Sequence, residues 1–132
     1  MSQENVEVVR RAIEAFNRRD IDAAFRDVDP EIELDWSRSR GVQAGIYRGI
    51  QASRDFWRNF LGMFDPLINT PDEFIECGEH VVVPFQTRLG GRDGIKVETH
   101  AAVVVALRSG RIVEWRLYQE RDEALKAVRL ED

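Results

Sequence analysis

Two side chains in the second half of the chain have types and a spacing that suit proton transfer. His100 and Glu98 are two positions apart in an extended segment, so on a β-strand they share one face. A neutral imidazole accepts a proton near pH 7, which predicts His100 as a base with Glu98 as its partner. The alternative is a histidine that only forms hydrogen bonds within a packed wall, with Glu98 outside or paired with an arginine.

Asp35 is a third candidate for acid–base chemistry. It belongs to Glu31 to Trp36, where Ile32, Leu34 and Trp36 alternate with acidic residues in the pattern of a strand with one buried face. This alternation predicts Asp35 on the outer, solvated face. A shift of one residue in the strand's register would instead turn Asp35 inward, where it could serve as a catalytic partner.

The sequence contains no motif for a metal or a nucleotide. Its two histidines lack paired ligand spacing, and Cys77 is the only cysteine, so neither a cysteine metal cluster nor an internal disulfide is expected. The glycine-rich segment Gly90 to Gly94 lies between two predicted strands with no helix after it, which predicts a hairpin rather than a phosphate-binding loop. We therefore expect no metal and no cofactor.

Composition limits the class of protein further. A chain of 132 residues with 43% hydrophobic and 33% charged residues is typical of one folded domain, here predicted to span residues 1–132. The net charge of −5 and the scattered arginines argue against nucleic-acid binding. No apolar run approaches the roughly 18 residues that span a bilayer, and the single cysteine fits a reducing cytoplasm, so we expect a cytoplasmic protein that does not enter membranes.

The pattern of apolar residues predicts helices first and strands afterwards. Helical spacing begins at Val6 and runs to Phe16, and a short second helix starts after Asp20 and ends at Asp29-Pro30. The other expected elements are a helix over Ile50–Phe64, strands over Glu31–Trp36, Glu73–Cys77, Val81–Leu89, Ile95–Leu107 and Arg111–Gln119, and a short helix over Arg121–Leu130. This order predicts an α+β fold with helices on one face of an antiparallel or mixed sheet.

Five local segments carry a resemblance to a known family. They read AIEAFNRRDIDAAF, DPEIELDW, YRGIQASRDFW, EFIECGEHVVV and LRSGRIVEWRLYQERDEAL, and they occur in family order across nearly the whole chain. The chain thus resembles the SnoaL-like branch of the nuclear transport factor 2-like superfamily, which also contains ketosteroid isomerases. The resemblance implies a strongly curved sheet wrapped into a cone, with a pocket between its concave face and the first and third helices, and homodimers through the sheet.

The resemblance also implies which side chains face this pocket. The expected ligand-binding residues are Phe16, Trp36, Trp57, Phe60, Leu61, Phe85, Ala102, Trp115, Leu117 and Gln119. Strand alternation would place His100 on the same face as Ala102. Such a wall suits a small, mostly apolar organic ligand, although aromatic residues at these spacings also form ordinary cores.

The resemblance leaves the reaction open. At the positions of the three catalytic residues of ketosteroid isomerases, the chain has Ala12, Trp36 and Ala102, and Leu117 replaces an aspartate of the limonene epoxide hydrolases. Neither of those two chemistries is therefore expected. An enzyme would be a cofactor-independent isomerase, cyclase, lyase or hydrolase that uses His100. The alternatives are a ligand-binding protein without catalysis and a dimeric scaffold.

Overall fold

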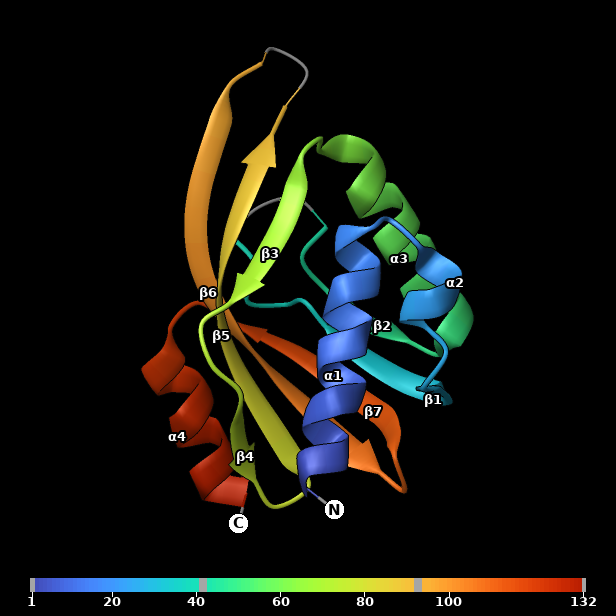
Figure 1. Ribbon diagram of the computed structural model, residues 1–132, viewed down its shortest axis with the longest axis vertical. Helices are drawn as coiled ribbons and strands as arrows, with labels where there is room; N and C mark the ends of the chain where they lie inside the picture. The colour runs from blue at the N-terminus through green and yellow to red at the C-terminus, as the bar shows by residue number, and fades with distance from the viewer. Residues whose placement is uncertain (1, 41–42, 92–93, 132) are drawn as a thin grey trace.

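Residues 2–40, 43–91 and 94–131 are described by a computed structural model, and over these residues seven strands form one curved sheet with helices on both faces (Figure 1). In chain order the elements are α1 (Ser2–Asn17), α2 (Ile21–Ala24), β1 (Val28–Asp35), β2 (Ile46–Arg48), α3 (Ile50–Met63), β3 (Leu67–Pro71), β4 (Ile75–Cys77), β5 (His80–Gly90), β6 (Lys96–Arg108), β7 (Arg111–Tyr118) and α4 (Arg121–Glu131). The predicted α+β class is confirmed.

The sheet is mixed rather than purely antiparallel. Its strand order is β2-β1-β7-β6-β5-β3, with β4 pairing a second stretch of β5. β1 and β7 are parallel, with Leu34 opposite Trp115, and the other neighbouring pairs are antiparallel. Because paired residues on adjacent strands share a face, this register decides which side chains point into the cone.

Helices α1 and α3 lie on the concave face, and α4 lies on the convex face (Figure 1). On the concave side, Val9 and Phe16 of α1 join one core cluster with Trp57 of α3 and the inward side chains of the sheet. On the convex side, Val104 of β6 belongs to a second cluster that includes Val128 of α4. The prediction that helices cover only one face is therefore wrong, because the short C-terminal helix covers part of the other face.

Two strands were not predicted, and one begins earlier than expected. β2 and β3 are only three and five residues long, and β3 ends at Pro71, which blocks further pairing. Both are outer strands, and whether so short a segment forms a strand depends on its partner strand more than on alternation in its own sequence.

Asp29-Pro30 lies within β1, so it does not end the preceding helix. The expected hairpin at Gly90–Gly94 joins β5 to β6, but residues 92 and 93 lie outside the described residues.

A close approach at Gly90 leads to a testable prediction. A Cβ atom on Gly90 would lie 3.0 Å from both the Asp65 carbonyl oxygen and Cδ of Pro66, and the backbone of Gly90 is hydrogen-bonded to both residues. Gly90→Ala is therefore expected to lower the free energy of unfolding by about 1–3 kcal/mol, as measured by urea denaturation. Gly62→Ala is the control, because it meets no atom within 4 Å in α3 and should raise stability by up to about 1 kcal/mol. Equal effects of the two substitutions would contradict this explanation.

Candidate functional site

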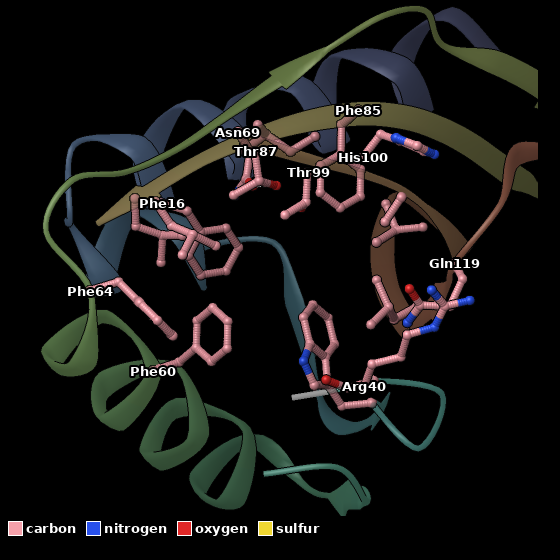
Figure 2. Close-up of a pocket in the computed structure, with 18 of the residues that line it drawn as sticks. Phe16, Arg40, Phe60, Phe64, Asn69, Phe85, Thr87, Thr99, His100 and Gln119 are labelled. Carbon is pink, nitrogen blue, oxygen red and sulfur yellow. Dashed lines mark hydrogen bonds between the residues drawn. The ribbon is translucent and has the colours of Figure 1, made fainter. Parts of the chain in front are cut away.

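A cavity of about 540 Å³ lies between the concave face of the sheet and helices α1 and α3 (Figure 2). The aromatic residues expected to line a pocket surround it: Phe16, Trp36, Trp57, Phe60, Phe85 and Trp115. Leu117 and Gln119 of the last strand also line it. The structure therefore places most of the sequence-predicted residues around one space, while their role in binding stays a prediction.

Three aromatic rings form the floor of this cavity. The ring centroid of Phe16 lies 4.5 Å from that of Trp57 and 6.0 Å from that of Trp115. These rings come from α1, α3 and β7, so they join three separate elements. On their other side the core is closely packed, with a void of only about 20 Å³. The rings thus separate an open cavity from a filled interior.

The inward face of β6 differs from the prediction. Ala102 pairs with Tyr118 and packs in the convex cluster beneath α4, whereas Val103 pairs with Leu117 and lines the cavity. The segment from Ala101 to Leu107 is apolar at every position, because both faces of β6 are buried. The sequence of such a strand does not alternate between apolar and polar residues, so it does not indicate which side chains face the cavity. The prediction that Ala102 binds ligand is therefore wrong, and so is the register on which it depended.

The predicted dyad of His100 and Glu98 does not form. The His100 side chain is 70% exposed at the mouth of the cavity, with its Nε2 atom 3.6 Å from Glu120, and its imidazole points away from the interior (Figure 2). Glu98 also borders the mouth and lies 4.0 Å from Arg88. The alternative of a His100 packed within a wall is wrong as well, since the side chain is exposed. Its other part, that Glu98 lies outside or pairs with an arginine, is confirmed by the contact with Arg88.

Leu61 is the other expected ligand-binding residue that lies elsewhere. It is buried on α3, but it is not part of the cavity lining. Its neighbour Phe60 lines the cavity and contacts Trp36 with a ring-centroid distance of 5.9 Å. Consecutive residues of a helix point in directions about 100° apart, so a helix that lines a cavity with Phe60 buries Leu61 at a different place.

Sequence reasoning missed a row of polar side chains on the opposite wall. Asn69 of β3 pairs with Thr87 of β5, which pairs with Thr99 of β6, and all three line the cavity (Figure 2). We call these three residues the polar row. The sequence pattern did not predict β3, and without that strand nothing in the sequence places Asn69 beside Thr87.

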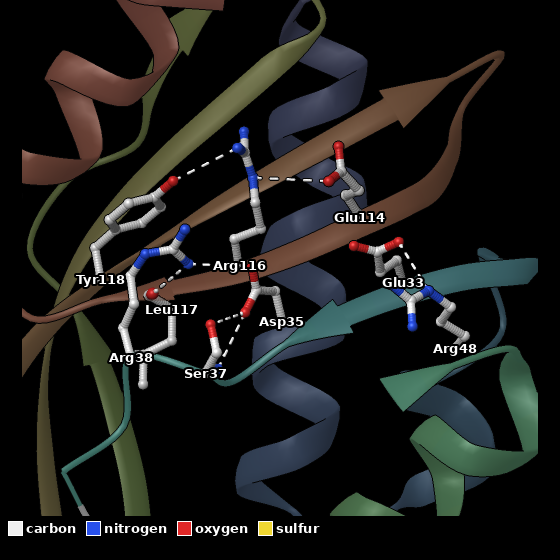
Figure 3. A network of polar contacts seen from close by, with 9 residues as sticks. All are labelled: Glu33, Asp35, Ser37, Arg38, Arg48, Glu114, Arg116, Leu117 and Tyr118. Carbon is white, nitrogen blue, oxygen red and sulfur yellow. Dashed lines mark hydrogen bonds and ion pairs between the residues drawn. The ribbon is translucent and has the colours of Figure 1, made fainter. Parts of the chain in front are cut away.

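Asp35 lies on the convex face, so it is not a catalytic partner inside the cavity. It is opposite Arg116 in the β1–β7 register, as the outer-face interpretation predicted, but it is only 7% exposed rather than solvated (Figure 3). Its carboxylate accepts hydrogen bonds from the Ser37 backbone N–H at 3.0 Å, the Ser37 hydroxyl at 2.5 Å and Arg38 Nη1 at 3.2 Å. These contacts make Asp35 a structural group at the end of β1.

Burial and hydrogen bonding act in opposite directions on the pKa of Asp35. Burial raises this pKa, but the hydrogen bonds from Ser37 and the positive charge of Arg38 together outweigh burial and hold the pKa below its ordinary value. The ionised form is therefore the one that the folded protein stabilises.

Two features that would indicate a metal site or a membrane span are absent from the described part of the chain. Its His, Cys, Asp and Glu side chains do not gather in groups of three or more that could hold a metal ion. None of its helices has the length and apolar composition needed to cross a membrane.

The fold and the cavity define a class of protein: an α+β cone whose curved sheet and two helices enclose an aromatic-lined space. Within this class the SnoaL-like domain matches residues 9–115. The chain belongs to the SnoaL-like family of the nuclear transport factor 2-like superfamily, as the resemblance implied. Among curated proteins, no relative matches it significantly.

Solved structures with the same fold cover nearly the whole chain. A nuclear transport factor 2-like protein of unknown function from Burkholderia pseudomallei is 25% identical, with 95% of this chain and 97% of that chain covered and a TM-score of 0.80. TerC, crystallised with polyporic acid, is 18% identical, with 96% and 98% covered and a TM-score of 0.79. A putative SnoaL-like polyketide cyclase from Jannaschia is 17% identical, with 96% and 92% covered and a TM-score of 0.77.

The lowered pKa of Asp35 predicts how one substitution depends on pH. The stability that ionised Asp35 contributes is fully present above the ordinary aspartate pKa of about 3.9 and is lost as the pH falls through its lower pKa in the folded protein. Asp35→Asn should therefore cost about 1–2 kcal/mol at pH 7, and this difference should shrink below about pH 4. Urea denaturation between pH 7 and pH 3 measures it.

Asp55→Asn provides the matched control for this experiment. Asp55 is exposed on α3, where it accepts hydrogen bonds from Gln51 and Arg58, and exposed pairs of this kind contribute little. Its substitution should change stability by less than about 0.5 kcal/mol at any pH. A difference between wild type and Asp35→Asn that stays constant down to pH 3 would show that the charge of Asp35 is not what stabilises the fold.

Proposed function

We propose that this protein binds a small, mostly apolar, ring-containing organic molecule in the cavity. The observation that carries the proposal is an aromatic-lined space of about 540 Å³, within the range of roughly 300–1,000 Å³ typical of small-molecule sites. All three tryptophans of the chain line it. Flat aromatic walls favour flat, ring-shaped ligands, because stacked and edge-to-face contacts between rings add to apolar burial.

Two further points support a small organic ligand. TerC, which shares the fold, was co-crystallised with polyporic acid. Among the described lining residues, the charged side chains Arg40, Glu98 and Glu120 are exposed at the mouth, so the interior is formed by apolar and uncharged polar side chains. We propose binding without a cofactor. A cytoplasmic location and a homodimer through the sheet stay predictions.

Filling the cavity provides the direct test. Ala101 is half-buried, pairs with Phe85 and lines the cavity, so Ala101→Phe would occupy space that a ligand needs. The probe is N-phenyl-1-naphthylamine, a neutral aromatic dye that fluoresces in apolar surroundings. We expect one dye molecule per wild-type chain and at least about tenfold weaker binding to the variant. Fluorescence titration measures both.

Arg108→Phe is the control for this substitution. Arg108 is exposed at the far end of β6, so the new ring lies on the same strand but away from the cavity. This variant should bind the dye as the wild type does. Dye binding that is equal in all three proteins would contradict the proposed site, and an absence of saturable binding would favour the dimeric scaffold instead.

Cofactor-free acid–base catalysis is a second candidate function. The observation in its favour is that His100 and Glu120, 3.6 Å apart, place an imidazole and a carboxylate together at the mouth of the cavity. A ligand held against the aromatic floor could extend to this pair, and His100 would act as the base. Glu120 replaces Glu98 and Asp35 as its proposed partner.

The two candidate functions predict different effects of one substitution. If His100 is the base, His100→Gln should lower kcat for any isomerisation, cyclisation, elimination or hydrolysis substrate found by screening by about 10²-fold or more, with dye affinity unchanged. His80→Gln is the matched control, since His80 lies at the start of β5, outside the cavity lining. Turnover that survives His100→Gln unchanged would leave ligand binding as the only function proposed.

A further inference from the structure

We infer that the polar end of the ligand is an uncharged hydrogen-bond acceptor, such as a ketone or quinone carbonyl, held by Asn69 and Thr99. This inference rests on the proposed function and narrows it to a class of molecule. The aromatic floor binds the rings, and the polar row on the facing wall orients them. The argument depends on how the row is held and on where the charges of the cavity lie.

The polar row spans three neighbouring strands at one level of the cavity wall. Thr87 on β5 is directly opposite both Asn69 on β3 and Thr99 on β6. Neighbouring strands are about 4.8 Å apart, so Asn69 and Thr99 are two strand spacings apart. Figure 2 shows the three side chains grouped across the cavity from Phe60 and Phe64. Hydrogen-bonding groups arranged in this way can contact the same polar end of one ligand.

Asn69 is fixed from two sides. The Asn17 side chain at the end of α1 forms two hydrogen bonds with the Asn69 backbone, donating to its carbonyl oxygen at 2.8 Å and accepting from its N–H at 2.9 Å. The Thr87 hydroxyl donates to Asn69 Oδ1 at 2.7 Å. Asn69 Oδ1 is thus already engaged, which leaves the two N–H donors of Nδ2 for another partner.

These donors, together with the Thr99 hydroxyl, suit an acceptor atom. In the described part of the chain, neither Asn69 Nδ2 nor the Thr99 hydroxyl forms a hydrogen bond, and both side chains line the cavity. A polar group that loses water on ligand binding must gain a new partner, or the ligand binds less tightly. A carbonyl oxygen has two lone pairs and no proton, so it can accept a hydrogen bond from either residue.

The ligand's polar end is uncharged because the row contains no charge. Arg40, the one cation among the described lining residues apart from the titratable His100, is exposed at the mouth, together with Glu98 and Glu120. A carboxylate bound at the row would lose its hydration and have no counterion beside it. Binding it there costs more free energy than binding a neutral acceptor. The row therefore selects a carbonyl over a carboxylate.

Three ligands with the same rings test this inference by displacement of N-phenyl-1-naphthylamine. They are 2-ethylnaphthalene, 2-acetylnaphthalene and 2-naphthoate, which present no acceptor, a neutral carbonyl and an anion. We expect Thr99→Val and Asn69→Leu each to weaken binding of the acetyl compound about 3- to 10-fold, with binding of the ethyl compound changed less than about twofold. Naphthoate should bind wild type more weakly than the acetyl compound.

Thr70→Val is the matched control, because Thr70 is exposed and adjacent to Asn69 on β3, so its side chain points to the other face. It should leave all three affinities unchanged. Thr99→Val exchanges one β-branched side chain for another of similar shape on an exposed part of β6, so it tests the inference even where Asn69→Leu fails to fold.

The outcomes separate this inference from the proposed function. Ethylnaphthalene binding that is lost in Ala101→Phe, combined with acetylnaphthalene binding that both polar-row variants leave unchanged, would overturn the inference and keep the cavity as the binding site. Naphthoate binding more tightly than acetylnaphthalene would also overturn it. If no compound displaces the dye and Ala101→Phe has no effect, the proposed function fails as well.

Discussion

The contact of Phe16 with Trp57 and Trp115 is the interaction on which the rest of the structure depends. It joins α1, α3 and β7 at one point, and the residues around it form the main core. Because three large rings meet there, the helices are fixed against the sheet at one end of the cone. Beyond the rings the same elements line an open cavity instead of a packed interior. One aromatic cluster thus provides both the stability of the fold and the floor of the site.

Because side chains alternate along each strand, the two faces of the sheet have different roles. On β7, Trp115 and Leu117 face the cavity, whereas Arg116 and Tyr118 lie on the convex face. There Arg116 contributes to a network of charges, with its Nε atom 3.9 Å from Glu114. Asp35 belongs to this convex face, so its depressed pKa reflects local structure at the end of β1 rather than preparation for catalysis. A perturbed carboxylate alone does not mark an active site.

The distribution of charge within the cavity bears directly on function. Ionisable side chains border the mouth, while the interior presents aromatic rings and the neutral groups of the polar row. An enzyme of this design would perform its proton transfers at the entrance, near His100 and Glu120. A binding protein would use the interior alone. The fold accommodates either arrangement, since SnoaL-like proteins share a scaffold whose function depends on the side chains that line it.

The sequence by itself determined the order of the main helices and strands, the family and most of the aromatic lining. The order of the elements depends on local periodicity, whereas the family and the lining, such as Phe16 on α1 and Trp115 on β7, followed from the resemblance of five local segments to a known family. Only the tertiary structure decided the inward face of β6, because Ala101 to Leu107 is apolar throughout and gives no alternation. It alone also brought Asn69 beside Thr87 and paired His100 with Glu120, since these contacts join residues from separate segments, whose positions depend on sheet register rather than on local sequence.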